Sequence, residues 1–291
     1  MRRLLIFKFA LFGFLIPAVA QTKPTLTKKI VYKTVGDVKL SLHVFEPAGH
    51  KPTDSRPAVV FFFGGGWYGG SPSQFYPHSA YLAERGMVAI AAEYRVKKKH
   101  GTSPFECVKD GKSAIRFVRA HAKQLGIDPE KIAAGGGSAG GHVAAATGTV
   151  PGLEEAGEDA AVSPIPNALV LFNPVYDNGP KGYGYERVKD RYKEISPFHN
   201  INKGMPPAIV FLGTKDKLIP VSTANAFKNK MIAAGSISEL HLYEGEPHGF
   251  FNAGKGDGSN YRDTVSKMDR FLESLGYLKG KPTIKPAAAG S

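Results

Sequence analysis

Three residues of the types that make a nucleophilic triad follow one another along the chain. Ser138 lies within residues 136–140, Gly-Gly-Ser-Ala-Gly, which fit the pattern G-x-S-x-G, and Asp216 and His248 come later. A serine hydroxyl is a weak nucleophile at neutral pH, so an imidazole must take its proton as it attacks. The imidazole in turn needs a carboxylate to fix its tautomer and stabilise its charged form. The pattern predicts Ser138 as nucleophile, His248 as general base and Asp216 as the acid that orients the base.

The segments around Ser138 are those that would expose its hydroxyl. Residues 131–134 predict a short buried strand, and residues 142–146 predict the start of an Ala-rich helix. A serine on a sharp strand-to-helix turn stands above the sheet, beside the free N–H groups of the helix N-terminus. Alone, this turn is also compatible with a nucleotide-binding loop, and Asp216 and His248 are each compatible with ordinary loop residues. The order Ser, Asp, His, with the last two after apolar strands, favours the triad.

A glycine-rich loop is the fourth part of the predicted site. Residues 63–67, Phe-Gly-Gly-Gly-Trp, follow an apolar stretch that predicts a buried strand. Glycines allow backbone N–H groups to turn toward a developing oxyanion, and the N–H of Ala139 would complete the hole. A phosphate-binding loop is disfavoured, because no Gly-Lys-Ser/Thr follows these glycines.

Apolar and helical stretches alternate along the chain and predict the fold. Strands are expected at residues 30–35, 38–45, 59–63, 88–92, 132–135, 168–172, 208–212 and 239–243, and helices at 74–85, 104–125, 138–147, 222–234 and 261–275. A hairpin followed by alternating helices and apolar strands predicts an α/β fold with a mostly parallel eight-stranded sheet and helices on both faces. Ligands of such sheets bind beyond the carboxyl ends of the strands, where the glycine loop and the triad fall.

These blocks together resemble the α/β-hydrolase carboxylesterases, in the branch related to hormone-sensitive lipase and to bacterial acetyl and feruloyl esterases acting on plant polysaccharides. The matching blocks are residues 63–67, 93–95, 110–119, 120–146, 196–197 and 213–248, and the resemblance covers roughly residues 30–277. It implies the α/β-hydrolase fold, with the amides of Gly65, Gly66 and Ala139 as oxyanion donors to the triad. It implies no metal and no organic cofactor. One position departs from the family pattern: Phe63 stands where a loop-supporting histidine is usual.

Length and composition fit one globular domain with a leader. The 291 residues are 42% hydrophobic, and residues 1–20 join two arginines, an apolar run and an A-x-A site. This pattern is typical of a secretory signal peptide, with an uncleaved membrane anchor as the alternative. The predicted organisation is a signal peptide (1–20), a catalytic domain (21–280) and a flexible C-terminal tail (281–291), with export to the periplasm or the extracellular space.

Charge and cysteine content indicate which binding partners and which disulfides are expected. The net charge is +13 for the whole sequence and +10 without the three cations of residues 1–20. This charge is expected to hold an exported protein near anionic polysaccharide, lipopolysaccharide or cell wall, and no aromatic-interleaved basic motif indicates nucleic-acid binding. The densest basic run, residues 97–100, predicts a solvated loop, with a binding patch as the alternative. The acidic stretch 152–159 predicts a surface loop rather than a metal site. Cys107, the only cysteine, predicts a packing residue and excludes an intramolecular disulfide.

The expected substrate is an ester that projects from a polymer or a soluble molecule. The insertion at 174–205 is the only long one after a predicted strand, so no large lid domain is expected. Trp67 and Tyr68, beside the glycine loop, are expected to contact a sugar ring or a cinnamoyl group, although aromatic residues there can also simply pack the loop. The sequence thus favours a secreted serine carboxylic ester hydrolase that removes acetyl or feruloyl groups from plant or algal polysaccharide. A general short-chain carboxylesterase and a non-catalytic carbohydrate-binding protein are the alternatives.

Overall fold

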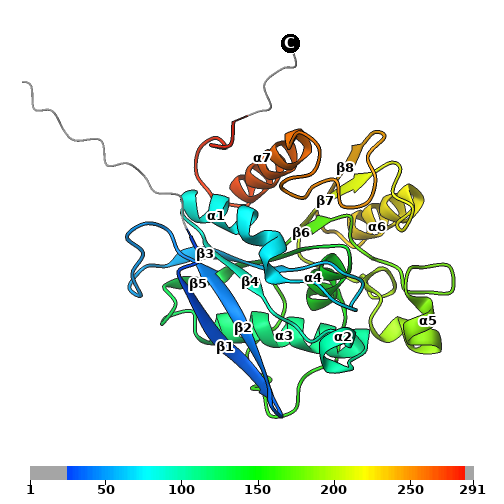
Figure 1. Ribbon diagram of the computed structural model, residues 1–291, viewed down its shortest axis with the longest axis horizontal. Coiled ribbons are helices and arrows are strands. Elements are labelled where there is room, and N and C mark those ends of the chain that lie inside the picture. Colours follow the sequence, from blue (N-terminus) through cyan, green and yellow to red (C-terminus); the bar gives the residue numbers. More distant parts are fainter. Residues whose placement is uncertain (1–24, 286–291) are drawn as a thin grey trace, which may run out of the picture.

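Eight strands form one mixed sheet in the computed structural model, which describes residues 25–285 (Figure 1). The strands are β1 (Lys28–Val35), β2 (Val38–Phe45), β3 (Arg56–Phe62), β4 (Val88–Ala92), β5 (Ile127–Gly137), β6 (Ala168–Phe172), β7 (Ala208–Gly213) and β8 (Ser238–Tyr243). Their order across the sheet is β1-β2-β4-β3-β5-β6-β7-β8. Strand β2 pairs antiparallel with β1 and β4, and every other neighbouring pair is parallel. The mostly parallel eight-stranded sheet expected from the sequence is confirmed.

Helices cover both faces of this sheet. They are η1 (Pro72–Phe75), α1 (Tyr76–Glu84), α2 (Lys97–His100), α3 (Pro104–Ala120), α4 (Ala139–Thr149), α5 (Tyr185–Val188), η2 (Lys189–Glu194), η3 (Pro197–His199), α6 (Val221–Ala233) and α7 (Ser259–Ser274). Helices α1 and α7 lie on one face, and α3, α4 and α6 lie on the other (Figure 1).

The alternation of side chains along the central strands divides the core between these two faces. In β3, Val60 and Phe62 pack toward α3 and α4, whereas Val59 and Phe61 pack toward α1 and α7. Successive side chains of a strand point to opposite faces, and a parallel strand that is covered on both sides is therefore apolar throughout. This explains the uninterrupted apolar stretch that precedes the glycine loop.

Two element boundaries differ from the sequence expectation by five residues each. Helix α3 ends at Ala120 instead of residue 125, and β5 begins at Ile127 instead of residue 132. The early start of β5 includes an irregularity, since its register with β3 shifts between Arg56↔Ile127 and Ala58↔Ile132. Residues 97–100, expected as a loop, form the single-turn helix α2, which ends at Gly101 in a left-handed conformation (φ 68°). A run of basic residues has no periodic apolar positions, so this helical turn could not be predicted from the sequence.

The ends of the chain are described in part. The predicted signal peptide, residues 1–20, and residues 286–291 of the predicted tail lie outside the described residues. Within the part of the tail that is described, Thr283 donates its N–H to the Tyr81 hydroxyl at 3.2 Å, and Ile284 packs against the core on the α1 and α7 face. Among the described residues, no helix is both long enough and apolar enough to cross a membrane.

Candidate active site

Ser138 occupies a strained turn between β5 and α4. Its backbone has φ 54° and ψ −121°, a combination that costs an L-residue of order 1–3 kcal/mol. The flanking glycines are required by close packing: a Cβ on Gly136 would lie 2.4 Å from the Gly140 carbonyl oxygen, and one on Gly140 would lie 2.1 Å from that of Phe62. The G-x-S-x-G pattern is thus a consequence of the backbone contacts that the turn makes with β3.

His248 and Asp216 form a close pair beyond the ends of β8 and β7. Nδ1 of His248 lies 2.7 Å from Oδ2 of Asp216, whose side chain is 0% exposed. The other carboxylate oxygen accepts the N–H groups of Leu218 at 2.8 Å and Ile219 at 3.1 Å. The carboxylate is therefore fixed on both oxygens, and it holds the proton of the imidazole on Nδ1. This leaves the lone pair of Nε2 to accept a proton.

The third member of the triad lies at the same edge of the sheet. Ser138 follows β5, which is separated from β7 by β6 alone. Among the described residues, however, no hydrogen bond joins Ser138 to His248. Catalytic hydrogen bonds are often long or poorly aligned in a free enzyme and tighten when substrate binds. The structure thus brings the three predicted residues to one edge and joins two of them directly.

Asn173, the residue that follows β6, lies against the base. Its Nδ2 is 3.4 Å from Nε2 of His248, and its Oδ1 accepts the N–H of Gly249 at 2.9 Å. Because a backbone N–H can only donate, Oδ1 must face Gly249 and the NH₂ group must face the imidazole. Asn173 is fully buried and has φ 33°, a left-handed conformation that asparagine tolerates better than most residues. It anchors the histidine loop to the centre of the sheet.

The glycine loop packs directly against the serine turn. A Cβ on Gly64 would lie 3.3 Å from Cβ of Ser138, and Gly65 and Gly66 have φ of 128° and 62°. The N–H groups of Gly65 and Gly66 donate no hydrogen bond within the described chain. Ala139 is the first residue of α4, so its N–H has no partner within the helix. These are the three amides that the sequence analysis assigned to the oxyanion hole.

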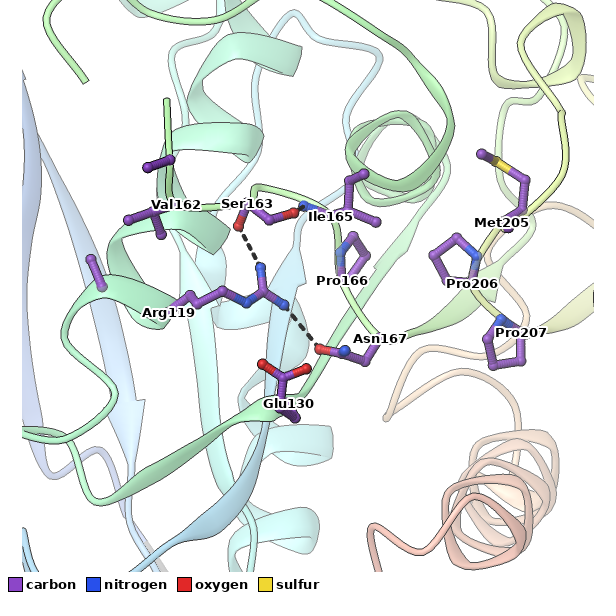
Figure 2. A pocket seen from close by; sticks show the side chains of 13 residues that line it. Arg119, Glu130, Val162, Ser163, Ile165, Pro166, Asn167, Met205, Pro206 and Pro207 are labelled. Atoms are coloured by element: carbon purple, nitrogen blue, oxygen red, sulfur yellow. Dashed lines mark hydrogen bonds between the residues drawn. The ribbon is translucent and has the colours of Figure 1, made fainter. Parts of the chain in front are cut away.

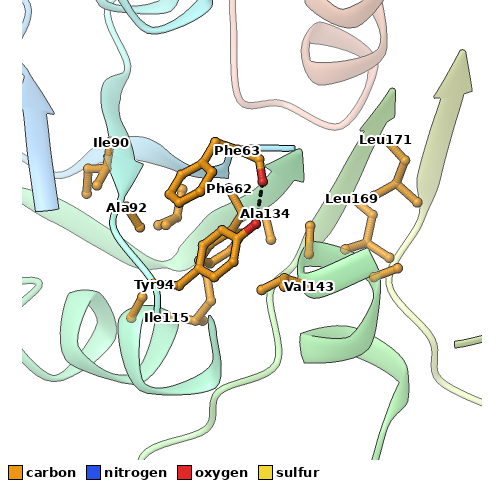
Figure 3. Close-up of a cluster of buried hydrophobic side chains, with 14 of the residues drawn as sticks. Phe62, Phe63, Ile90, Ala92, Tyr94, Ile115, Ala134, Val143, Leu169 and Leu171 are labelled. Atoms are coloured by element: carbon orange, nitrogen blue, oxygen red, sulfur yellow. Dashed lines mark hydrogen bonds between the residues drawn. The ribbon is translucent and has the colours of Figure 1, made fainter. Parts of the chain in front are cut away.

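Tyr94 supports the glycine loop by contacting Phe63, the residue that stands where the family pattern has a histidine. The Phe63 and Tyr94 rings stack with centroids 4.2 Å apart, and the Tyr94 hydroxyl donates to the Phe63 carbonyl oxygen at 2.6 Å (Figure 3). Both residues are buried, and a Cβ on Gly70 would lie 2.4 Å from the Phe63 ring. At Phe63 the loop is therefore held by aromatic packing and by a buried hydrogen bond.

Gln74 holds the other side of the loop and connects it to the histidine loop. Its Oε1 accepts the N–H of Gly64 at 2.6 Å, and its Nε2 donates to Oδ1 of Asn252 at 2.9 Å. Nδ2 of Asn252 donates in turn to the Gly249 carbonyl oxygen at 2.8 Å. Together with Asn173, these amides make a continuous series of hydrogen bonds from the glycine loop to the general base.

Trp67, which the sequence analysis expected to contact a sugar ring or a cinnamoyl group, is almost completely buried. The side chain is only 2% exposed, and its Nε1 donates to Nδ1 of His142 at 3.3 Å. Nε2 of His142 donates to the Ile195 carbonyl oxygen at 2.9 Å, and burial lowers the pKa of this imidazole to about 4. Because His142 is neutral and uses both nitrogens, it ties the glycine loop to the insertion at 174–205. Trp67 faces inward because the loop turns at φ 56°, which the sequence alone does not reveal.

Tyr68 lies on the outside of the same loop. Its side chain is 55% exposed and lines a cavity of about 560 Å³ that reaches Gly66. This cavity opens beside the predicted oxyanion donors, between the glycine loop, α2 and α5.

A second cavity, of about 730 Å³, lies at the opposite edge of the sheet, before β6 and β7 (Figure 2). Arg119 lines this cavity, and its guanidinium donates hydrogen bonds to the carbonyl oxygens of Pro129 and Ser163 and to Oδ1 of Asn167. These bonds occupy the guanidinium, and no triad residue lines the cavity. The predicted triad lies at the other edge, beyond the carboxyl ends of the strands.

The acidic stretch 152–159 forms ion pairs with the domain. Glu154 contacts Lys112 and Arg116, while Glu155 contacts Lys33 at 2.6 Å and Arg95 at 3.1 Å. Within residues 25–285, no three His, Cys, Asp or Glu side chains gather as a set of metal ligands. The stretch is a loop held by basic side chains, and Cys107 is buried, as expected for a packing residue.

Sequence reasoning did not single out the amides of Asn173, Gln74 and Asn252, nor His142. Asn173 offered one usable signal, since it is a polar residue directly after an apolar parallel strand, where ligand-facing residues occur. Gln74 and Asn252 lie in irregular segments whose spacing predicts nothing about their contacts.

Acyl transfer is the chemistry for which this edge of the sheet is arranged, and with this topology it defines the protein as a serine esterase of the α/β-hydrolase fold. The BD-FAE family model matches residues 42–167, and the chain belongs to that family. Thermogutta terrifontis esterase 2, in the form phosphorylated by paraoxon, is 48% identical and superimposes with a TM-score of 0.84, over 89% of this chain and 98% of that one. Its propionate-bound form gives a TM-score of 0.84 at 48% identity, over 87% of this chain and 96% of that one.

Two curated relatives are more distant and longer. Esterase LipC of Mycobacterium tuberculosis is 28% identical over 77% of this chain and 60% of its own length. An acetylxylan esterase of Xylanibacter ruminicola is 27% identical over 97% of this chain and 56% of its own length. The chain therefore spans less than two thirds of either relative.

Proposed function

We propose that the protein hydrolyses short-chain carboxylic esters through an acyl-enzyme on Ser138, and that acetyl groups on plant or algal polysaccharide are its preferred substrate. The observation that carries the proposal is the Asp216–His248 pair at 2.7 Å, at the same sheet edge as the strained serine and the free loop amides. The export predicted from residues 1–20 is part of the proposal, since it would bring the enzyme to such polymers.

The proposed reaction has two steps. Oγ of Ser138 attacks the acyl carbon while its proton passes to Nε2 of His248, displacing the contact with Asn173. The N–H groups of Gly65, Gly66 and Ala139 hold the oxyanion, and the alcohol leaves with the proton from His248. A water molecule, deprotonated by His248, then hydrolyses the acyl-enzyme and releases the carboxylic acid.

The acetylated carbohydrate is supported by two observations. The relative from Xylanibacter ruminicola, which aligns with 97% of this chain, is named an acetylxylan esterase. The exposed ring of Tyr68 beside the glycine loop is a surface on which a sugar ring can stack. Feruloyl groups, which the family resemblance implies, are the second acyl candidate.

A general short-chain carboxylesterase is the second candidate function. Thermogutta terrifontis esterase 2 has been solved with propionate and with butyrate, at 48% and 47% identity to this chain. These bound acids favour a short acyl group and give no preference for the alcohol.

Acetate release from acetylated xylan tests the proposal, with wild type beside Ser138→Ala and a soluble aryl acetate as the second substrate. We expect wild type to act on both, and we expect the substitution to lower turnover by about 10⁶ if the triad acts as a unit. Activity on the aryl acetate alone would retain the esterase and reject the xylan. A wild-type protein that is inactive on acetyl and feruloyl esters but binds xylan would instead be a non-catalytic carbohydrate-binding protein.

A further inference from the structure

The cavity beside the glycine loop has a basic wall. Its volume is about 560 Å³, and its lining includes Trp67, Tyr68, Lys97, Ser103, Glu186 and Arg187. Gly66, one of the predicted oxyanion donors, also lines it. An acetyl or propionyl group fills only a small part of such a volume. The cavity is therefore large enough for the alcohol side of the ester.

Lys97 is held at this wall by backbone contacts. The N–H of Lys97 donates to the Trp67 carbonyl oxygen at 2.9 Å, and that of Lys98 donates to the Tyr68 carbonyl oxygen at 2.8 Å. Helix α2 is thereby fastened to the glycine loop. The Lys97 side chain is exposed and forms no ion pair with any described residue, and of the three lysines of α2 it is the one that lines the cavity.

Arg187 supplies a second positive charge. It donates to the Gly66 carbonyl oxygen, and its guanidinium lies 5.5 Å from the Trp67 ring and 5.4 Å from the Tyr183 ring. Nε of Arg187 is also 3.1 Å from the carboxylate of Glu186. Two cations and one carboxylate thus line the cavity, which leaves one positive charge, carried by Lys97, without a partner.

We propose that this cavity is a subsite for the alcohol side of the substrate, and that it selects a sugar bearing a carboxylate. The ring of Tyr68 stacks on the sugar, while Lys97 attracts the carboxylate. This inference rests on the proposed function, because it names the kind of acylated carbohydrate on which that function acts.

A matched pair of substrates tests the subsite. They are a methyl hexuronoside and the methyl hexopyranoside that differs from it only at C6, each carrying one acetyl group at the same position. Rates are normalised to an uncharged aryl acetate. We expect wild type to favour the uronoside in kcat/KM by about fivefold at low salt, and we expect this preference to fall toward unity near 1 M salt, where the Debye length is about 3 Å.

Two charge-reversing substitutions in α2 distinguish an effect of Lys97 in the cavity from an effect of the protein's net charge. Lys97→Glu should abolish or invert the preference for the uronoside. Lys99→Glu makes the same change in net charge, on an exposed residue that does not line the cavity, and should keep the preference.

The results that would contradict the subsite also show which part of the proposal fails. Equal kcat/KM for the two sugars in wild type, or an equal loss of preference in both variants, would overturn the subsite and leave the acetylated carbohydrate intact as substrate. Cleavage of the aryl acetate with no acetate released from either sugar would reject the carbohydrate substrate, and the subsite with it.

Discussion

Asn173 places its side-chain nitrogen 3.4 Å from Nε2 of His248, the nitrogen that must receive the proton of Ser138. The free enzyme therefore presents the base with a neutral amide donor, which the serine hydroxyl must replace during the reaction. Since Oδ1 of the same side chain holds the Gly249 N–H at 2.9 Å, one residue both orients the imidazole and anchors its loop.

Asn173→Asp tests the first of these roles. The substitution keeps the acceptor for Gly249 and brings a negative charge beside the imidazole, which stabilises the imidazolium form. Because the base must be neutral to act, the acid limb of the kcat/KM profile should move to higher pH by about one unit. A pH–rate profile on an aryl acetate measures this shift. An unchanged acid limb would show that Asn173 does not approach His248 in the working enzyme.

Gln74→Ala should loosen the glycine loop. The variant loses the acceptor of the Gly64 N–H and the donor to Asn252, so the oxyanion amides are held less firmly. We expect kcat to fall by about tenfold with little change in KM, less than the 10²–10³ that follows removal of a donor itself. Ser73→Ala, on an exposed neighbour in η1, is the matched control. A rise in KM alone would contradict a role in holding the loop.

Tyr94→Phe should destabilise the protein, because it leaves the buried carbonyl oxygen of Phe63 without a partner. An unsatisfied buried acceptor costs about 1–3 kcal/mol in the free energy of unfolding. Urea denaturation of the variant beside wild type measures the loss. Tyr68→Phe, which removes a hydroxyl from an exposed ring, serves as the control and should change stability by less than about 0.5 kcal/mol. Equal midpoints for both variants would refute the support that we assign to Tyr94.

Two buried histidines make the fold sensitive to acid. Burial lowers the pKa of His78 to about 3 and that of His142 to about 4, whereas an unfolded histidine titrates near 6.5. Below pH 6.5 the unfolded chain binds protons that the folded chain does not, so stability is complete above 6.5 and falls as the pH drops toward 4. The slope approaches about 1.4 kcal/mol per pH unit for each histidine.

His78→Phe should remove one of these two contributions. Neither nitrogen of His78 has a hydrogen-bond partner among the described residues, and aromatic rings surround it, among them Phe75, Phe172 and Tyr261. The variant should therefore lose less stability than wild type between pH 6.5 and pH 5, as measured by urea denaturation at each pH. A slope identical to that of wild type would mean that His78 titrates normally in the folded protein.

The parts of the fold and of the site that follow a periodic pattern or a fixed order of residues could be predicted from the sequence. The apolar strands, the glycines of the serine turn and the order Ser138, Asp216, His248 are of this kind. The direction of a side chain in an irregular loop has no such pattern. Trp67 and Tyr68 are adjacent and aromatic, yet the loop buries one and exposes the other. The replacement of the usual histidine by Phe63 could be noticed in the sequence, but its compensation by Tyr94, which lies after β4, required the fold.

The turn at Ser138 separates two kinds of constraint that act on neighbouring positions. Gly136 and Gly140 have no room for any side chain, so a library screened only for soluble expression should retain glycine at both. Ser138 itself holds a conformation that glycine adopts more readily. The same screen should therefore enrich Ser138→Gly, which gives a more stable but inactive protein. Retention of serine throughout such a screen, in which turnover confers no advantage, would contradict the strain that we assign to this turn.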